Sequence, residues 1–284
     1  MNRAKPLLLS CLLLTAWTRS LCAQEILVKD GQKIAFLGDS ITQMGQDGLG
    51  YCQLVISGLK ANGVGATMVR AGISGHTSRD MLARVERDVI NKKPDWMTLS
   101  CGVNDVWHGA GGVVLDKYKE NITAIVDKVT AAGIKVVILT STMIGEDQPN
   151  GNNQKLVAYN DFLKSLAAER KFPLADLNAD MQATIKDFGP HQGNLLTRDG
   201  VHMNGFGDVM MASGVLKAFG LGAEQLAKAK ADWDAKGVRV AGPQMSFTLA
   251  QIDQLKAAAA KQGKSVGDLV MAAFNAAMDG LLKQ

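Results

Sequence analysis

Short apolar runs alternate with helical patterns along most of the chain. Runs of strand length lie at residues 34–37, 66–71, 96–101, 135–140 and 173–177. Segments whose apolar residues recur every three or four positions follow them, at about 51–62, 78–91, 113–132, 154–170 and 206–219. A shorter helical stretch precedes the last of these segments. This alternation predicts strands that are each followed by a helix.

Such a pattern is typical of a parallel sheet with helices on both faces. Strands that are buried on both faces are almost continuously apolar, and parallel neighbours need helical crossover connections. Five such units joined by right-handed crossovers predict an α/β fold, a three-layer α/β/α sandwich with a five-stranded parallel sheet.

The last part of the chain has no strand pattern. Residues 222–284 are rich in Ala, Lys and Gln, and Gly242-Pro243 interrupts them. Thr248 and Gln251 then have the spacing of a capping box at the start of an Ala-rich helix. A second amphipathic helix is expected at 265–282. We therefore expect a main domain at 24–221 and a helical C-terminal extension at 222–284, ending in a helical hairpin that docks on the domain or mediates oligomerisation.

The first 23 residues have the order of regions found in a secretory signal peptide. Two positive charges in residues 1–5 precede a Leu-rich run at 6–17, and the segment ends in the small residue Ala23. We expect cleavage after Ala23 and a secreted or periplasmic protein. The alternatives are an uncleaved anchor and a lipoprotein attached through Cys22. No later segment is apolar over about 18 residues, so no membrane span is expected after cleavage.

Removal of this leader changes the charge of the chain. The full sequence has 31 Lys and Arg residues against 27 Asp and Glu. The leader holds three of the basic residues and none of the acidic ones, which leaves 28 against 27, a net charge of +1. This balance gives no support for a nucleic-acid or membrane-surface partner.

Two cysteines remain after the leader, Cys52 and Cys101. They are able to pair in an oxidising compartment. Their predicted places, in a helix and in an apolar strand, favour small buried side chains instead.

Polar segments with catalytic potential follow four of the predicted strands. They are GDS at 38–40, GISGHTS at 72–78, CGVND at 101–105 and RDGVHMNGFG at 198–207. Each one alone is ordinary turn chemistry. Because the carboxyl ends of parallel strands meet at one edge of a sheet, we expect them to combine into an acyl-transfer site.

These segments resemble the four signature blocks of the SGNH hydrolase superfamily, the GDSL-type esterases and lipases. GDSIT resembles the first block, SGHT the second, GVND the third and DGVH the last. The resemblance covers about residues 33–220 and is strongest to a bacterial carbohydrate-esterase-like branch. The GDSL motif that names the family has leucine after the serine, whereas this chain has Ile41 at that position. The resemblance implies an SGNH/flavodoxin-like fold and esterase activity, and nothing about the C-terminal hairpin.

Three of these residues have the chemistry of a catalytic triad. A serine is a weak nucleophile unless a base accepts its proton, and His202 is the best candidate to activate Ser40. Asp199 lies three residues earlier, within reach of the imidazole, where it would orient the ring and stabilise its charged form.

A tetrahedral intermediate also needs donors for its oxyanion. The backbone N–H groups of Ser40 and Gly75 and the side-chain amide of Asn104 are the candidates. His76, Trp107 and His108 are candidates for a substrate pocket, in which an aromatic wall would suit a sugar ring. A structural role for them stays open.

Two further acids next to these motifs are expected to be structural. Asp39 is expected to organise the turn before Ser40. Asp105 is expected to orient Asn104 or to cap the next segment.

The sequence supports no metal and no organic cofactor. Its four histidines are scattered, no His-Glu-x-x-His or Cys-x-x-Cys occurs, and no glycine-rich nucleotide loop follows a strand. We therefore expect an exported serine esterase that cleaves short acyl or acetyl esters, including carbohydrate-linked ones, through an acyl-enzyme. The alternatives are a lipase or acyl-thioesterase of the same fold, or a non-catalytic carbohydrate-binding protein.

Overall fold

A five-stranded parallel sheet forms the centre of the fold. The computed structural model describes residues 25–283 except 190, 192 and 239–247. The predicted leader and its cleavage site after Ala23 lie outside these residues. The strands are β1 (Lys33–Gly38), β2 (Thr67–Gly72), β3 (Trp96–Ser100), β4 (Lys135–Leu139) and β5 (Leu174–Ala175), and their order across the sheet is β2-β1-β3-β4-β5.

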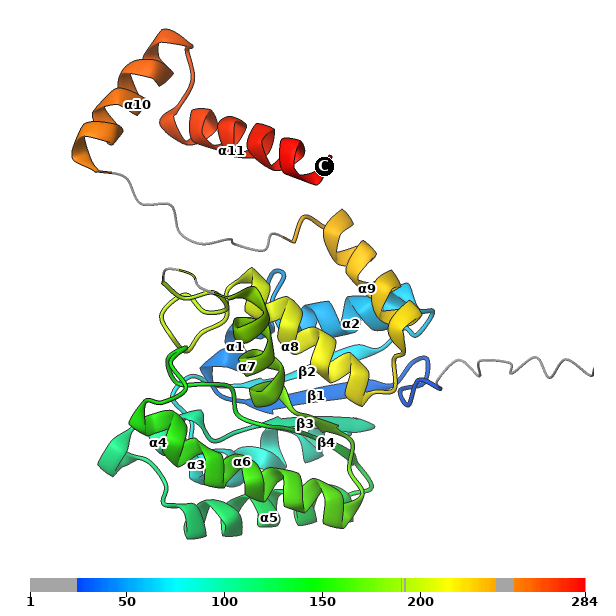
Figure 1. The fold of residues 1–284 in the computed structure, drawn as a ribbon. Coiled ribbons are helices and arrows are strands. Elements are labelled where there is room, and N and C mark those ends of the chain that lie inside the picture. The colour runs from blue at the N-terminus through cyan, green and yellow to red at the C-terminus, as the bar shows by residue number, and fades with distance from the viewer. Residues whose placement is uncertain (1–24, 190, 192, 239–247, 284) are drawn as a thin grey trace, which may run out of the picture.

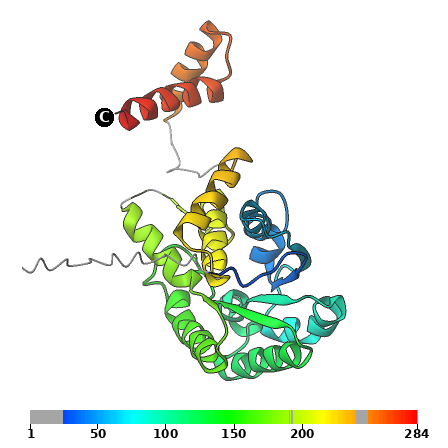
Figure 2. The same ribbon diagram turned by 90° about the vertical axis from the view of Figure 1, so that its right-hand side faces the viewer.

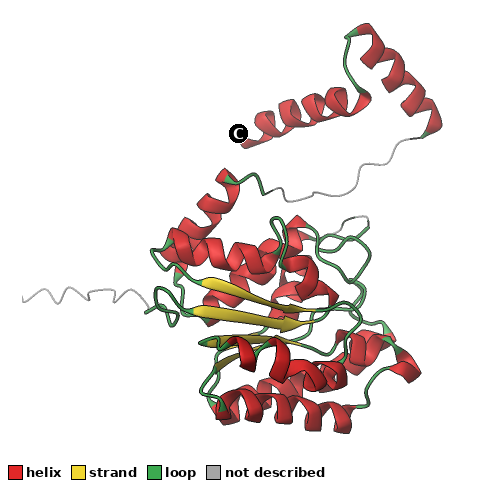
Figure 3. Cartoon of the chain, turned by 180° about the vertical axis from the view of Figure 1, so that it is seen from behind, coloured by secondary structure: helices red, strands yellow, loops and turns green. Residues whose placement is uncertain are grey.

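Helices cover both faces of the sheet, so the predicted three-layer sandwich is confirmed (Figures 1 and 3). One face carries α2 (Tyr51–Ala61), α7 (Leu177–Phe188) and α8 (Gly205–Ala218). The opposite face carries α3 (Ser78–Asp88), α5 (Leu115–Ala131) and α6 (Gly151–Arg170). The view in Figure 2, turned by a quarter, shows the two helical layers on either side of the strands.

The central strands are the most deeply buried elements. Ile34, Phe36 and Leu37 of β1 and Leu99 of β3 have no exposed surface. This burial on both faces explains why these strands are apolar without alternation. Between β1 and β3 the order of connection reverses, and ligands of doubly wound sheets bind outside the carboxyl ends of the strands at such a point.

Four short elements were not predicted. The structure adds α1 (Ser40–Gly45), α4 (Val103–Trp107) and two 3₁₀ turns, η1 (Ile90–Lys92) and η2 (Gly109–Gly111). A helix of five or six residues is too short to show a periodicity of 3.6 residues. The expected helix at 78–91 ends at Asp88, and η1 and a left-handed Lys93 follow it before Pro94.

The C-terminal part contains three helices, α9 (Ala223–Ala235), α10 (Leu249–Lys261) and α11 (Val266–Leu282). Helix α9 packs on α2, and the buried Trp233 donates from Nε1 to the Leu54 carbonyl at 3.0 Å. Helix α9, which lies in the predicted C-terminal extension, thus packs on a helix of the predicted main domain, and the boundary at residue 221 stays a prediction.

Helices α10 and α11 pack on each other and lie apart from the sandwich in Figure 1. The expected capping box is present, because Thr248 Oγ1 accepts from Gln251 N and Gln251 Oε1 accepts from Thr248 N. The role of this hairpin, in docking or in oligomerisation, stays a prediction.

Cys52 and Cys101 are both buried and unpaired. In the described part of the chain, no helix combines the length and the apolar character that a membrane crossing needs.

Candidate active site

Ser40 lies at the switch point, where β1 passes directly into α1. Asp39 caps the helix, and its Oδ1 accepts a hydrogen bond from Ile41 N at 3.0 Å. A Cβ atom on Gly38 would lie 2.0 Å from Thr42 Oγ1, so the tight turn into the helix requires glycine. As the first residue of α1, Ser40 has a backbone N–H with no acceptor in the helix.

Ser40, His202 and Asp199 form a continuous hydrogen-bonded chain. The Oγ of Ser40 lies 2.8 Å from His202 Nε2. His202 Nδ1 lies 2.7 Å from Asp199 Oδ2. These distances suit a neutral imidazole that donates to the carboxylate and accepts from the hydroxyl. The structure thus brings together the three residues that the sequence singled out.

The surroundings of the Asp199 carboxylate favour its charged form. Partial burial raises its pKa, but hydrogen bonds from the His202 ring, the His202 backbone N and the Val201 backbone N outweigh this and lower the pKa to about 2. Asp199 is therefore ionised throughout the neutral range and able to stabilise an imidazolium.

Glu146, in the loop after β4, holds the segment that precedes the Asp199–His202 turn. Its carboxylate accepts from Leu195 N at 2.7 Å, Leu196 N at 2.9 Å, Thr197 N at 2.8 Å and Thr197 Oγ1 at 2.6 Å. The neighbouring Gly145 N donates to the Gly200 carbonyl at 2.7 Å. The sequence analysis missed Glu146, since about 50 residues separate it from the segment that it holds.

The expected oxyanion donors lie at the ends of β1, β2 and β3. Gly75 is exposed and adopts a φ of +77°, in the region that favours glycine. Asn104 is buried, and one N–H of its amide donates to the His76 carbonyl at 3.0 Å. An amide nitrogen carries two hydrogens, so the second N–H of Asn104 remains available.

The buried Arg84 ties this edge of the sheet together. Its guanidinium donates to the carbonyls of Gly38 and Ala71, each at 2.8 Å, and to His76 Nδ1 at 2.9 Å. Nδ1 of His76 is therefore an acceptor, and its proton lies on Nε2. Burial, and then the charge of Arg84, lower the pKa of His76, which keeps this ring neutral. Sequence reasoning missed Arg84, whose position beside the apolar face of α3 gives no signal of this role.

Two buried carboxylates lie behind the nucleophile. Burial raises the pKa of Asp39 to about 6; the hydrogen bond from Ile41 opposes this, and the charge of Asp105 adds to it. Asp105 accepts from Ser78 N at 2.9 Å and from Ser78 Oγ at 2.5 Å, and burial raises its pKa as well. Asp105 thus connects α4 to the start of α3.

Trp107 and His108 lie at the end of α4, just beyond Asn104. Trp107 is 45% exposed and His108 is exposed, with their ring centroids 6.4 Å apart. Their role as a pocket wall stays a prediction. No group of three His, Cys, Asp or Glu side chains suited to hold a metal ion occurs within the described ranges.

A doubly wound sheet with a hydrogen-bonded Ser-His-Asp chain at its switch point defines a serine hydrolase outside the Gly-x-Ser-x-Gly class. Comparison with known proteins agrees. The model of the GDSL-like Lipase/Acylhydrolase family matches residues 36–208. The chain belongs to this family and is a carboxylic ester hydrolase of the SGNH type.

Two curated relatives cover most of the catalytic domain. An acetylxylan esterase of Geobacillus stearothermophilus is 29% identical over an alignment of 213 residues, and the match covers 68% of this chain and 96% of the relative. Esterase TesA of Pseudomonas aeruginosa is 29% identical over 196 residues, 69% of this chain and 88% of the relative.

Solved structures of acetyl xylan esterases have the same fold. The enzyme AlAXEase is 34% identical with a TM-score of 0.62, and the match covers 66% of this chain and 98% of that one. Axe2 of Geobacillus stearothermophilus is 28% identical with a TM-score of 0.62, covering 69% of this chain and 97% of that one.

Proposed function

We propose that this protein is an exported esterase that removes acetyl or other short acyl groups from carbohydrates, with Ser40 as its nucleophile. The observation that carries the proposal is the chain of hydrogen bonds from Asp199 through His202 to Ser40, with lengths of 2.7 and 2.8 Å. His202 Nε2 is therefore within the distance at which it can take the proton of the Ser40 hydroxyl.

Acylation begins when Ser40 Oγ attacks the ester carbonyl carbon. His202 Nε2 takes the hydroxyl proton, and the resulting imidazolium is stabilised by the Asp199 carboxylate. The carbonyl oxygen becomes an oxyanion, which Ser40 N, Gly75 N and the free N–H of Asn104 stabilise. When the tetrahedral intermediate collapses, the ester C–O bond breaks and His202 gives its proton to the leaving alcohol.

Deacylation repeats these steps with water as the nucleophile. His202 removes a proton from the water as it attacks the acyl-serine, and then returns a proton to Ser40 Oγ. The products are the free acid and the regenerated enzyme. No cofactor enters either half of the reaction.

The choice of a carbohydrate substrate is supported by the relatives. Those described above include acetylxylan esterases, both among the curated relatives and among the solved structures. Among solved structures of Axe2, the catalytic mutants replace a serine, an aspartate and a histidine, and the last two lie three positions apart, as Asp199 and His202 do.

Export is supported by the leader pattern of residues 1–23. A lipoprotein of Bacillus subtilis is among the relatives, at 25% identity over 174 residues. Fractionation of the source cells, followed by N-terminal sequencing of the enzyme, tests this part of the proposal. A mature chain that starts at Gln24 is the expected result, and an intact leader on a cytoplasmic protein would refute it.

The activity is tested by hydrolysis of p-nitrophenyl esters from acetate to palmitate, with acetylated xylan alongside. We expect the highest kcat/KM on acetate and release of acetate from the polysaccharide. The Ser40→Ala variant is the control for background hydrolysis. A preference for long acyl chains would favour a lipase or thioesterase instead, and no hydrolysis by the wild type would refute an enzymatic function.

A further inference from the structure

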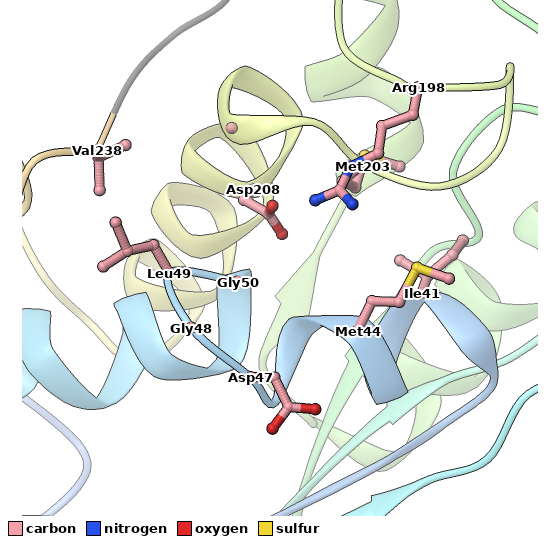
Figure 4. Close-up of a pocket in the computed structure, with 11 residues that line it drawn as sticks. Ile41, Met44, Asp47, Gly48, Leu49, Gly50, Arg198, Met203, Asp208 and Val238 are labelled. Atoms are coloured by element: carbon pink, nitrogen blue, oxygen red, sulfur yellow. The ribbon is translucent and has the colours of Figure 1, made fainter.

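A cavity of about 500 Å³ lies beside the triad (Figure 4). Three of its lining residues are direct chain neighbours of the triad: Ile41 follows Ser40, Arg198 precedes Asp199, and Met203 follows His202. The triad residues themselves and the oxyanion candidates Gly75 and Asn104 are not part of the lining. The cavity therefore lies next to the segment that contains Asp199 and His202.

One wall of this cavity contains a buried carboxylate with a free oxygen. Asp208 is only 7% exposed, and one of its oxygens accepts from Tyr51 N at 2.9 Å. Within the described residues no donor reaches the other oxygen. Figure 4 shows the carboxylate directed into the cavity. This oxygen faces the cavity and is able to accept a hydrogen bond from a ligand bound there.

The opposite side of the cavity presents hydrogen-bond donors. Arg198 is exposed, and Figure 4 shows its guanidinium extending over the cavity on the side that Asp208 faces. No described group forms a hydrogen bond or an ion pair with this guanidinium. Burial raises the pKa of Asp208 to about 6, and the hydrogen bond from Tyr51 N and the charge of Arg198 oppose this rise.

Apolar side chains, glycines and Asp47, which forms an ion pair with Arg70, complete the lining. Met44 and Leu49 are large apolar residues with exposed fractions of 46% and 39%, and they lie at the rim of the cavity. This combination fits a neutral polyol with an apolar ring face. An anion would meet Asp208, a cation would meet Arg198, and an acyl chain would leave both unpaired.

We propose that this cavity binds the sugar ring of the leaving alcohol, with Asp208 accepting from a ring hydroxyl and Arg198 donating to another. The inference rests on the proposed esterase function. The leaving oxygen must receive its proton from His202 Nε2, so the alcohol lies on the His202 side of the nucleophile, and this cavity is lined by the chain neighbours of His202 and Asp199. Its volume lies within the range of about 300–1,000 Å³ typical of small-molecule sites.

Binding is tested without turnover in the Ser40→Ala protein. Xylotriose, titrated by calorimetry and by NMR, is expected to bind saturably. Asp208→Asn keeps an acceptor for Tyr51 N and replaces the free oxygen with an NH₂ group, and Arg198→Gln removes the charged donors. Each is expected to weaken binding of xylotriose about tenfold or more. Arg170→Gln, the same substitution at the far end of α6, is the matched control and should leave binding unchanged.

Turnover provides the second measurement. For the same variants with Ser40 restored, the ratio of kcat/KM on acetylated xylotriose to kcat/KM on p-nitrophenyl acetate is expected to fall about tenfold, mainly through KM. The nitrophenyl ester has no sugar hydroxyls and serves as the reference.

The outcomes separate the two proposals. If the wild type hydrolyses p-nitrophenyl acetate but xylotriose does not bind, or binds all variants equally, the sugar cavity is refuted while the esterase function stands. If no ester is hydrolysed, the proposed function fails, and the xylotriose titration still decides whether the cavity binds a sugar. Arg198→Gln changes an exposed residue, so it gives a result even if Asp208→Asn does not fold.

Discussion

At the scale of single residues, the reaction depends on the proton that passes between Ser40 and His202. Ser40→Ala and His202→Ala are each expected to lower kcat by about 10⁴-fold or more, because triad members act as a unit. Asp199→Ala should be about a hundredfold less damaging, since an imidazole without its carboxylate still accepts a proton. The measurement is kcat for the three variants on p-nitrophenyl acetate, with thermal unfolding to verify the fold.

Two results would contradict this ranking of the triad variants. If Asp39→Ala were as damaging as His202→Ala without loss of folding, the carboxylate beside the nucleophile would be catalytic. Retention of more than a tenth of the wild-type kcat by Ser40→Ala would rule out Ser40 as the nucleophile.

Asn104 is expected to act on the transition state rather than on the bound substrate. Asn104→Ala should lower kcat by roughly 10²–10³-fold with little change in KM, because the amide stabilises charge that develops only during the reaction. Steady-state kinetics on one activated ester distinguish the two effects. A rise in KM at unchanged kcat would instead assign Asn104 to ground-state binding.

The residues of the site differ in how far they were predictable. Ser40, Gly75 and Asn104 lie in local motifs just after apolar strands, and Asp199 and His202 lie in a short motif of their own, so local sequence patterns identified all five. Glu146 and Asp208 act on segments that are distant in sequence, with Glu146 binding the backbone of Leu195 and Asp208 that of Tyr51. No local pattern marks such a contact, and only the folded structure reveals it.

At the scale of elements, the long apolar strands and amphipathic helices were predictable, because burial sets their composition. The short helices α1 and α4 were not, although they carry Ser40 and Asn104. Their ends are fixed by turns rather than by periodicity: Asp39 caps α1, and Gly102, with a φ of +135°, precedes α4. The least predictable elements are thus those that place the catalytic groups.

The loop after β4 is expected to hold the catalytic segment in place through Glu146. Glu146→Ala removes four hydrogen bonds to residues 195–197 and should lower kcat about 10- to 100-fold, since small displacements of a catalytic group are costly. The KM should change less than kcat, and the unfolding temperature should fall. Glu169→Ala, at the exposed end of α6, is the matched control. An unchanged kcat with a lowered unfolding temperature would limit Glu146 to supporting the fold.

At the scale of the whole molecule, the buried acid beside the nucleophile affects stability. Burial raises the pKa of Asp39 from 3.8 to about 6. Between these values the folded protein binds more protons than the unfolded chain, so the free energy of unfolding falls as the pH rises. Asp39→Asn preserves the shape of the helix cap but cannot bind a proton. Between pH 4 and 7 its free energy of unfolding should therefore fall by up to about 3 kcal/mol less than that of the wild type.

Denaturant unfolding at several pH values measures the decrease for both proteins. Burial also raises the pKa of Asp208 to about 6. Asp208 therefore contributes the same pH dependence of stability to the wild type and to Asp39→Asn, and its contribution cancels when the two proteins are compared. Asp116→Asn, at a side chain that is 92% exposed, is the matched control. Equal pH dependence of Asp39→Asn and the wild type would show that Asp39 is not the group responsible.

The extent of the cooperative domain can be decided by two truncations. A chain of residues 24–238 retains α9, whereas a chain of residues 24–221 loses it and uncovers the side of α2 on which Trp233 packs. Since burial of a tryptophan contributes about 3–5 kcal/mol, we expect the shorter chain to lose at least this much free energy of unfolding and the longer chain to match the enzyme of residues 24–284. Trp233→Ala in the longer chain should reproduce most of the loss. If both truncated chains unfolded with the same free energy, α9 would belong with the C-terminal extension and the boundary at residue 221 would be correct.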